Sequence, residues 1–154
     1  MPNSVTSLGN DCFNGCTSLT TLDLSNRTTE AISIGADAFY GCESLKAIFI
    51  PAELEFEYTS SDSATDYVDK FVAVPLATPT ISPCYARDTT IEGTYNIPGA
   101  TIYTENGLLS TIVDETGYWY INLEDSLIEE DTVGVYASYY DFESELATIT
   151  VDYY

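Results

Sequence analysis

Apolar positions recur at a fixed spacing in the first third of the chain. Residues 3–24 carry a pattern of apolar, glycine and cysteine positions that returns twenty-six positions later. Five apolar pairs match at this spacing: Leu8 with Ile34, Phe13 with Phe39, Leu19 with Leu45, Leu22 with Ile48 and Leu24 with Ile50. Gly15-Cys16 and Gly41-Cys42 match as well. A period in the twenties is typical of solenoids, which act more often as binding scaffolds than as catalysts.

Each repeat predicts a short strand with one buried face, because its apolar residues alternate with polar ones. One repeat cannot bury this face alone, and about three are normally needed for stability. The sequence shows two, and the pattern is already running at Pro2. We therefore expect an exposed apolar rim that contacts another copy, another protein or preceding chain. The predicted interface residues are Val5, Leu8, Phe13, Leu22 and Leu24.

The residues of the two repeats resemble one protein family. PNSVTSLG at 2–9 and CFNGCTSL at 12–19 follow the pattern of the BspA-like bacterial surface leucine-rich repeats, and IFIP closes the second unit at 48–51. The resemblance covers residues 2–51 and implies a short leucine-rich-repeat solenoid. The chain departs from the family in a longer connection at 25–31, and in Cys12, which stands where the second unit has Ala38.

Residues 52–76 predict a hairpin and linker that cap the solenoid. Glutamates alternate with apolar residues at 53–58, which predicts a strand with an acidic outer face. A turn-forming run at 60–65 separates it from a second strand predicted at 68–74. A proline-containing linker follows at 75–80.

Residues 77–154 predict an antiparallel β-sandwich. Short strand candidates recur with turn signals between them, at 80–85, 89–95, 100–104, 108–113, 118–123, 132–139 and 146–151. Trp119 is expected in the core, with Tyr118 and Tyr120 pointing outward on the same strand. For the many tyrosines of this region, packing of the sheet faces is favoured; the alternative is that exposed tyrosines beside acids stack on sugar rings or form a protein interface.

Three segments of this region resemble bacterial immunoglobulin-like domains. They are GTYNIPGATIY at 93–103, DETGYWYINL at 114–123 and DTVGVYA at 131–137. Their order and spacing hold across residues 79–151. The resemblance implies a two-sheet sandwich that serves as a spacer or adhesion module on extracellular proteins and phage particles. The whole chain is thus expected to be mainly β, with repeats at 1–51, a capping hairpin at 52–76 and a sandwich at 77–154.

The charge excludes some partners. Four basic residues face 25 acidic ones, a net charge of −21, so nucleic acids and anionic membranes should repel the chain. No apolar stretch approaches the length of a membrane span, and the first ten residues lack a signal peptide. We expect either a processed piece or a protein that reaches the outside without secretion, as a virion protein does.

No catalytic motif stands out. Without histidine there is no nucleophile–histidine pair and no histidine metal ligand, and no phosphate loop precedes a helix. We expect no enzyme and no cofactor. Acidic clusters at Asp62, Asp66 and Asp69 and at 129–131 are weak candidates for Ca²⁺, with a solvated turn favoured. Four cysteines, at Cys12, Cys16, Cys42 and Cys84, leave their disulfide status open.

These observations favour a non-enzymatic adhesion or interaction module, located extracellularly or on a cell surface. Its partner would be a protein or a glycan, and the uncapped repeat would mediate a homo-oligomer or larger assembly. One alternative is a phage virion decoration or fibre protein on the virion surface. A second is the accessory region of a secreted carbohydrate-active enzyme.

Overall fold

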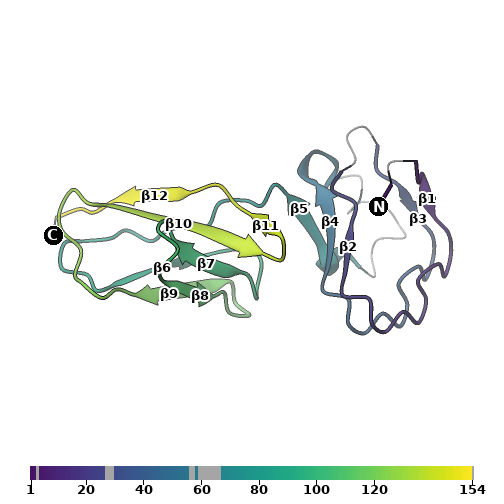
Figure 1. The fold of residues 1–154 in the computed structure, drawn as a ribbon, viewed down its shortest axis with the longest axis horizontal. Coiled ribbons are helices and arrows are strands. Elements are labelled where there is room, and N and C mark those ends of the chain that lie inside the picture. Colours follow the sequence, from purple (N-terminus) through teal and green to yellow (C-terminus); the bar gives the residue numbers. More distant parts are fainter. Residues whose placement is uncertain (3, 27–29, 56–57, 59–66, 154) are drawn as a thin grey trace. The chain divides into compact units, whose positions relative to one another are not determined.

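The computed structural model describes every residue except 3, 27–29, 56–57, 59–66 and 154. The chain is mainly β and divides into two compact units, Met1–Pro75 and Leu76–Tyr154, which we call unit 1 and unit 2 (Figure 1). Each unit has its own hydrophobic core.

Unit 1 is built from short parallel strands. Its strands are β1 (Ser7–Leu8), β2 (Thr21–Asp23), β3 (Ser33–Ile34), β4 (Ala47–Pro51) and β5 (Phe71–Val74). β1 pairs with β3, and a second sheet has the order β2-β4-β5. Leu8 lies opposite Ile34 and Leu22 opposite Ile48, so the strand register reproduces the spacing of the sequence repeat. We call residues 7–24 the first repeat and residues 33–50 the second repeat.

The turns of the two repeats have the same geometry. Gly15 and Gly41 adopt φ of 72° and 71°, a conformation that favours glycine. The backbone N–H of Phe13 donates to the carbonyl of Ala38, and that of Gly15 donates to Tyr40, both at 2.8 Å. The backbone ladder therefore continues from the strands through the turns.

An aromatic stack follows the same direction. The rings of Phe13 and Phe39 lie 5.5 Å apart and within 5° of parallel, as their equivalent positions predict. Tyr67 then meets Phe39 edge to face at 5.1 Å. The stack crosses the core of unit 1 and buries Phe39 completely between its neighbours.

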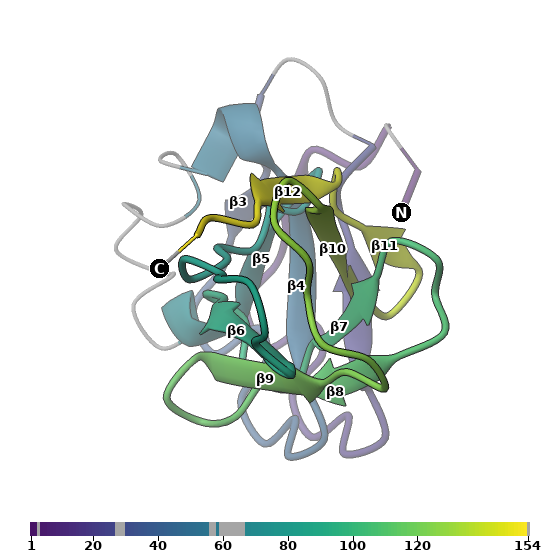
Figure 2. The same ribbon diagram turned by 90° about the vertical axis from the view of Figure 1, so that its left-hand side faces the viewer.

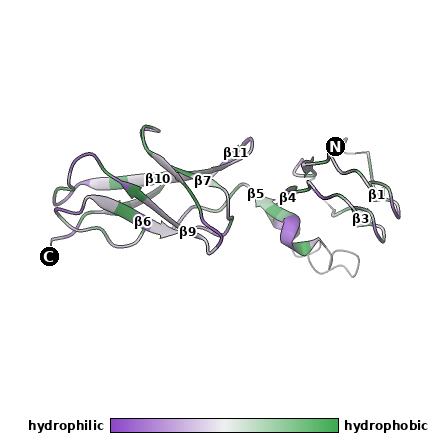
Figure 3. Ribbon diagram, turned by 90° about the horizontal axis from the view of Figure 1, so that it is seen from below, coloured by the Kyte–Doolittle hydropathy of each residue, from purple (hydrophilic) through white to green (hydrophobic). Residues whose placement is uncertain are grey.

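The prediction of a capping hairpin at 52–76 is wrong. Ala52–Leu54 is a 3₁₀ turn (η1), and β5 pairs with β4 in the parallel direction, with Pro51 opposite Val74. Alternation around Leu54 also suits a helical turn that buries one apolar side chain, which is what Leu54 does. Figure 3 shows the apolar β5 directly after the polar 3₁₀ turn η3 (Val68–Lys70). The segment adds a third rung to the parallel sheet, where the sequence showed only two.

Two tyrosine hydroxyls accept hydrogen bonds from backbone N–H groups of unit 1 in and next to the second repeat. The hydroxyl of Tyr58 accepts the backbone N–H of Ile32 at 3.2 Å, and that of Tyr67 accepts the N–H of Phe39 at 3.3 Å. These buried N–H groups would cost free energy if left unpaired. Two side chains therefore satisfy donors that a further repeat would otherwise pair.

Unit 2 consists of antiparallel strands in two sheets (Figures 1 and 2). One sheet has the order β11-β10-β7-β8, with β12 also paired to β10, and the other is β6-β9. The strands are β6 (Thr90–Thr94), β7 (Thr101–Thr104), β8 (Ser110–Ile112), β9 (Tyr118–Asn122), β10 (Thr132–Tyr139), β11 (Phe142–Glu143) and β12 (Ala147–Thr150). Inward side chains of both sheets share one core, including the expected Trp119, which is almost completely buried.

The strand expected at 80–85 is not regular. Thr80 and Ser82 donate their N–H groups to Thr94 and Glu92 on β6, and Tyr85 makes a single bridge to Asp152. Pro83 has no N–H to donate, so a continuous ladder is interrupted there. The segment follows the sheet edge without completing a strand.

Tyr95 predicts a specific response of unit 2 to alkali. Its side chain is buried, its hydroxyl has no hydrogen-bond partner within the described residues, and desolvation raises its pKa to about 12. An unfolded tyrosine ionises near pH 10, so the stability contributed by this neutral phenol is complete below about pH 10 and is lost as the pH rises towards about 12. Tyr95→Phe should therefore lose about 1 kcal/mol less stability than the wild type between about pH 8 and about pH 11.

Urea unfolding at both pH values measures this difference. At neutral pH Tyr95→Phe should be as stable as the wild type or slightly more so, because it removes an unsatisfied buried hydroxyl. Tyr153→Phe, at an exposed position, is the control and should follow the wild type at both pH values. If Tyr95→Phe and the wild type lost equal stability at alkaline pH, the raised pKa of Tyr95 would not be the cause of the loss.

Candidate interaction surface

The two repeats of unit 1 differ in burial at equivalent positions. Phe39, Leu45 and Ile48 of the second repeat are buried, whereas Phe13, Leu19 and Leu22 of the first are only partly buried. The second repeat lies between the first repeat and the segment that contains Tyr58, Tyr67 and β5. Within the described residues, the strands of the first repeat pair only with those of the second. Apolar residues are consequently accessible along the first repeat. We call this surface the open edge; it consists of Met1, Val5, Phe13, Leu19 and Leu22.

The structure corrects the predicted rim at two positions. Leu8 and Leu24 are only 7% and 1% exposed and belong to the core, so they present no surface to a partner. Leu8 lies opposite Ile34, and both Leu8 and Leu24 pack in the core of unit 1. Met1 and Leu19 also belong to the open edge, although neither is among the predicted rim residues. For Leu19, its match with Leu45 in the repeat was the available sequence evidence.

The backbone of the open edge presents acceptors. In the turns, N–H groups of the first repeat donate to carbonyls of the second, at Ala36, Ala38 and Tyr40. The equivalent carbonyls of the first repeat belong to Asn10, Cys12 and Asn14. None of these three accepts a backbone hydrogen bond from the part of the chain that the structure describes. A polypeptide with outward N–H groups at the same spacing would continue the ladder.

Two equivalent glycines show how closely repeats pack. A Cβ added at Gly35 would lie 2.5 Å from the backbone nitrogen of Asn10 in the first repeat. A Cβ added at Gly9 meets nothing within 4 Å. Glycine is therefore needed at position 35, where the first repeat packs against it. At the equivalent position 9, a side chain would have room.

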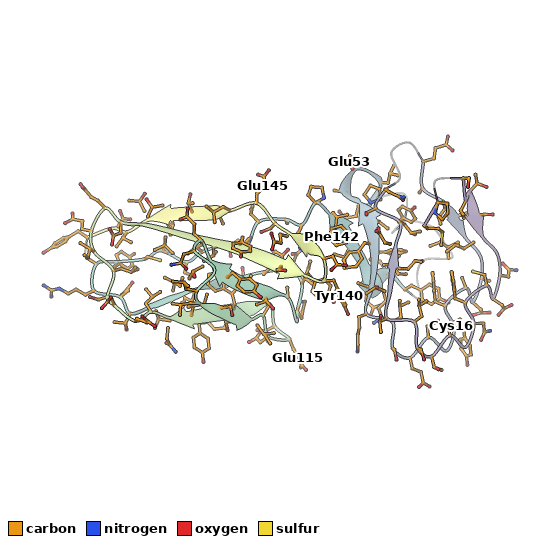
Figure 4. The ribbon with its side chains drawn as sticks, in the orientation of Figure 1. Cys16, Glu53, Glu115, Tyr140, Phe142 and Glu145 are labelled. Atoms are coloured by element: carbon orange, nitrogen blue, oxygen red, sulfur yellow. The ribbon has the colours of Figure 1, made fainter. Side chains whose placement is uncertain are left out.

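The cysteines of unit 1 gather at the turns of the repeats, and Figure 4 shows Cys16 there. All four cysteines of the chain are free thiols, with Cys12 and Cys16 exposed. The Cys42 thiol donates to the carbonyl of Phe13 at 3.1 Å. Desolvation raises the pKa of Cys12 and of Cys42, which disfavours the reactive thiolate.

The predicted calcium cluster is only partly described. Asp62 and Asp66 lie outside the described residues, and Asp69 on η3 pairs with the Lys70 ammonium at 2.6 Å. In the second acidic run, the Asp131 carboxylate accepts the N–H of Ile128 at 3.3 Å. Over the described ranges, no three or more Asp, Glu, Cys or His side chains form a group that could hold a metal ion.

Comparison with known proteins identifies the repeats. Residues 1–64 match the family model described as "BspA type Leucine rich repeat region (6 copies)". This match supports the resemblance of residues 2–51 to BspA-like leucine-rich repeats. The match ends before unit 2, so the immunoglobulin-like resemblance of residues 79–151 stays a prediction.

One solved structure similar to this chain is described as "Biofilm associated protein - BSP domain". It shares 25% identity with a TM-score of 0.42, and the match covers 49% of this chain and 14% of that chain. No curated protein matches the sequence. Among the described residues, no helix is long and apolar enough to cross a membrane.

Proposed function

We propose that this chain is a non-enzymatic interaction module of a bacterial surface. Unit 1 contributes coils of a leucine-rich-repeat solenoid, and unit 2 is an immunoglobulin-like sandwich that serves as a spacer or adhesion module. The family match over residues 1–64 supports the surface assignment, because the BspA-like repeats that the sequence resembles are bacterial surface repeats. The proposed location is the cell surface or the extracellular space.

The observation that carries the proposal is the open edge. Partly buried apolar side chains lie there beside backbone acceptors, whereas Phe39, Leu45 and Ile48 of the second repeat are buried. Apolar surface next to a sheet edge favours association with another polypeptide. The occupant we propose is a polypeptide whose backbone N–H groups extend the parallel ladder and whose apolar side chains cover Phe13 and Leu22. The large negative charge reduces non-specific association, so a specific contact is favoured.

Display of the full chain on bacterial cells tests this function. Cells that display the wild type should aggregate or attach to one another more than cells that display nothing. Leu22→Glu places a charge in the apolar contact and should abolish the difference. Val5→Glu, a second variant at the open edge, should do the same if Leu22→Glu folds poorly.

Leu108→Glu is the matched control. It makes the same substitution at a leucine of unit 2 that is 80% exposed, and should leave attachment unchanged. Thermal melts establish that each displayed protein is folded. Attachment equal to that of bare cells, or unchanged attachment by folded Leu22→Glu and Val5→Glu, would overturn the proposal.

A further inference from the structure

The start of β9 is fixed by a short acidic turn. The Asp114 carboxylate accepts the backbone N–H of Thr116 at 2.8 Å, its hydroxyl at 2.6 Å, and the N–H of Tyr118 at 3.0 Å. The Thr116 hydroxyl and these N–H groups lower the pKa of Asp114. Gly117 closes the turn with φ of 84°. Figure 4 shows Glu115 on this turn, pointing away from the unit. β9 therefore begins at a defined residue, which fixes which side chains face outward.

The outer face of β9 carries two tyrosines. Trp119 and Ile121 point into the core, so Tyr118, Tyr120 and Asn122 point outward. The Tyr118 hydroxyl donates to the Glu92 carboxylate of β6 at 2.5 Å, and this hydrogen bond raises the pKa of Tyr118. The rings of Tyr118 and Tyr120 lie 6.3 Å apart, tilted by 30°. Tyr118 is thus held in place, while Tyr120 is 50% exposed beside it.

A hollow of about 320 Å³ lies next to Tyr120, between β8 and β9. β8 is the last strand of one sheet and β9 the last strand of the other, and they lie side by side in Figure 2 without a hydrogen-bonded ladder. No ionisable carboxylate or amine lines the hollow. The lining residues are Leu109, Ser110, Thr111, Tyr120, Ile121 and Asn122.

The polar groups of the hollow are neutral and available. Asn122 accepts the Thr90 hydroxyl at 3.3 Å through its side-chain oxygen, which leaves both N–H groups of the amide to donate. The hydroxyls of Ser110, Thr111 and Tyr120 have no hydrogen-bond partner in the described part of the chain. The site combines one aromatic face with several neutral donors and acceptors.

This chemistry fits a sugar ring. A pyranose has an apolar face of C–H groups that covers an aromatic ring, and hydroxyls around its rim that pair with amides and hydroxyls. A carboxylated or sulfated sugar would find no cation among the lining residues, and the chain's net charge of −21 would repel it. An added peptide strand is less suited, because β8 has only three residues to pair with it. We propose that this hollow binds a neutral pyranose of a surface polysaccharide.

Calorimetric titration of the full chain tests the site. The probes are the neutral hexasaccharides cellohexaose, mannohexaose, xylohexaose and N-acetylchitohexaose, with a hexamer of galacturonate as the charged comparison. At least one neutral probe should bind, and the charged one should not. Tyr120→Ala should weaken binding about tenfold or more, and Asn122→Ala should weaken it as well.

Tyr153→Ala is the matched control, because it removes an exposed tyrosine of unit 2 that does not line the hollow. It should bind like the wild type. No binding of any neutral probe at roughly 10 mM would overturn the proposal. So would equal weakening by Tyr120→Ala and Tyr153→Ala, or binding of an extended peptide in place of the sugars. Leu22→Glu should keep full sugar binding, so failure here is distinguishable from failure of the open edge.

Discussion

Replacing Gly93 with alanine is expected to destabilise unit 2 by about 3 kcal/mol or more, the largest effect we expect from a single methyl group. A Cβ at this position would lie 2.0 Å from the backbone carbonyl oxygen of Thr80 and 2.7 Å from the ring of Trp119. Thr80 cannot retreat, because its N–H and hydroxyl both bond to Thr94. Urea unfolding followed by Trp119 fluorescence measures the loss, since Trp119 is the chain's single tryptophan.

Gly134→Ala is the control for this change. Gly134 also lies in a strand, but the nearest atom to an added Cβ is the Glu105 carboxylate oxygen at 2.9 Å, at the end of a flexible side chain. Its loss should be well below that of Gly93→Ala. A Gly93→Ala protein that unfolds at the same urea concentration as Gly134→Ala would show that the backbone at Thr80 yields.

Phe39→Ala should cost unit 1 about 3–5 kcal/mol, because it removes a buried ring from the middle of the aromatic stack. The cavity would lie between Phe13 and Tyr67, and neither neighbour can fill it without breaking its own contacts. Amide hydrogen exchange of β4 measures the loss, since this strand pairs on both sides within unit 1.

Phe13→Ala makes the same change at the equivalent position of the first repeat. Phe13 is only partly buried, so its loss should be about half as large. The ratio of the two losses therefore reports how well the open edge is covered in solution. Equal losses would contradict an open edge.

The sequence predicted the parts of the molecule that depend on local pattern. The apolar positions matched by the repeat spacing are the ones that pair in the strand register and that stack as Phe13 on Phe39, because equivalent residues occupy equivalent places in successive repeats. The alternation around Trp119 predicted which side chains of β9 enter the core. These features follow from periodicity, which is the same whatever the chain packs against.

The errors fall where a partner far along the chain decides the outcome. Residues 52–54 have the alternation of a strand but form a 3₁₀ turn that buries Leu54 in the core of unit 1. Phe71–Val74 pairs with β4 although its sequence lacks the Gly-Cys pair of the two repeats. Parallel pairing needs only a free strand edge and an apolar face. Tyr58 and Tyr67 show no repeat signal, yet their hydroxyls satisfy the backbone of the second repeat.

The sequence alone determined the mainly β class, the repeats, the place of Trp119 and the net charge of −21. The tertiary structure decided which rim residues are exposed: Leu8 and Leu24 turn inward, whereas Leu19 stays at the open edge. It also decided that Tyr120 and Asn122 meet Ser110 and Thr111 around one hollow. Periodicity fixes the direction of a side chain relative to its own strand, but exposure and neighbourhood depend on which strands end side by side, and that is set by the packing of the whole unit.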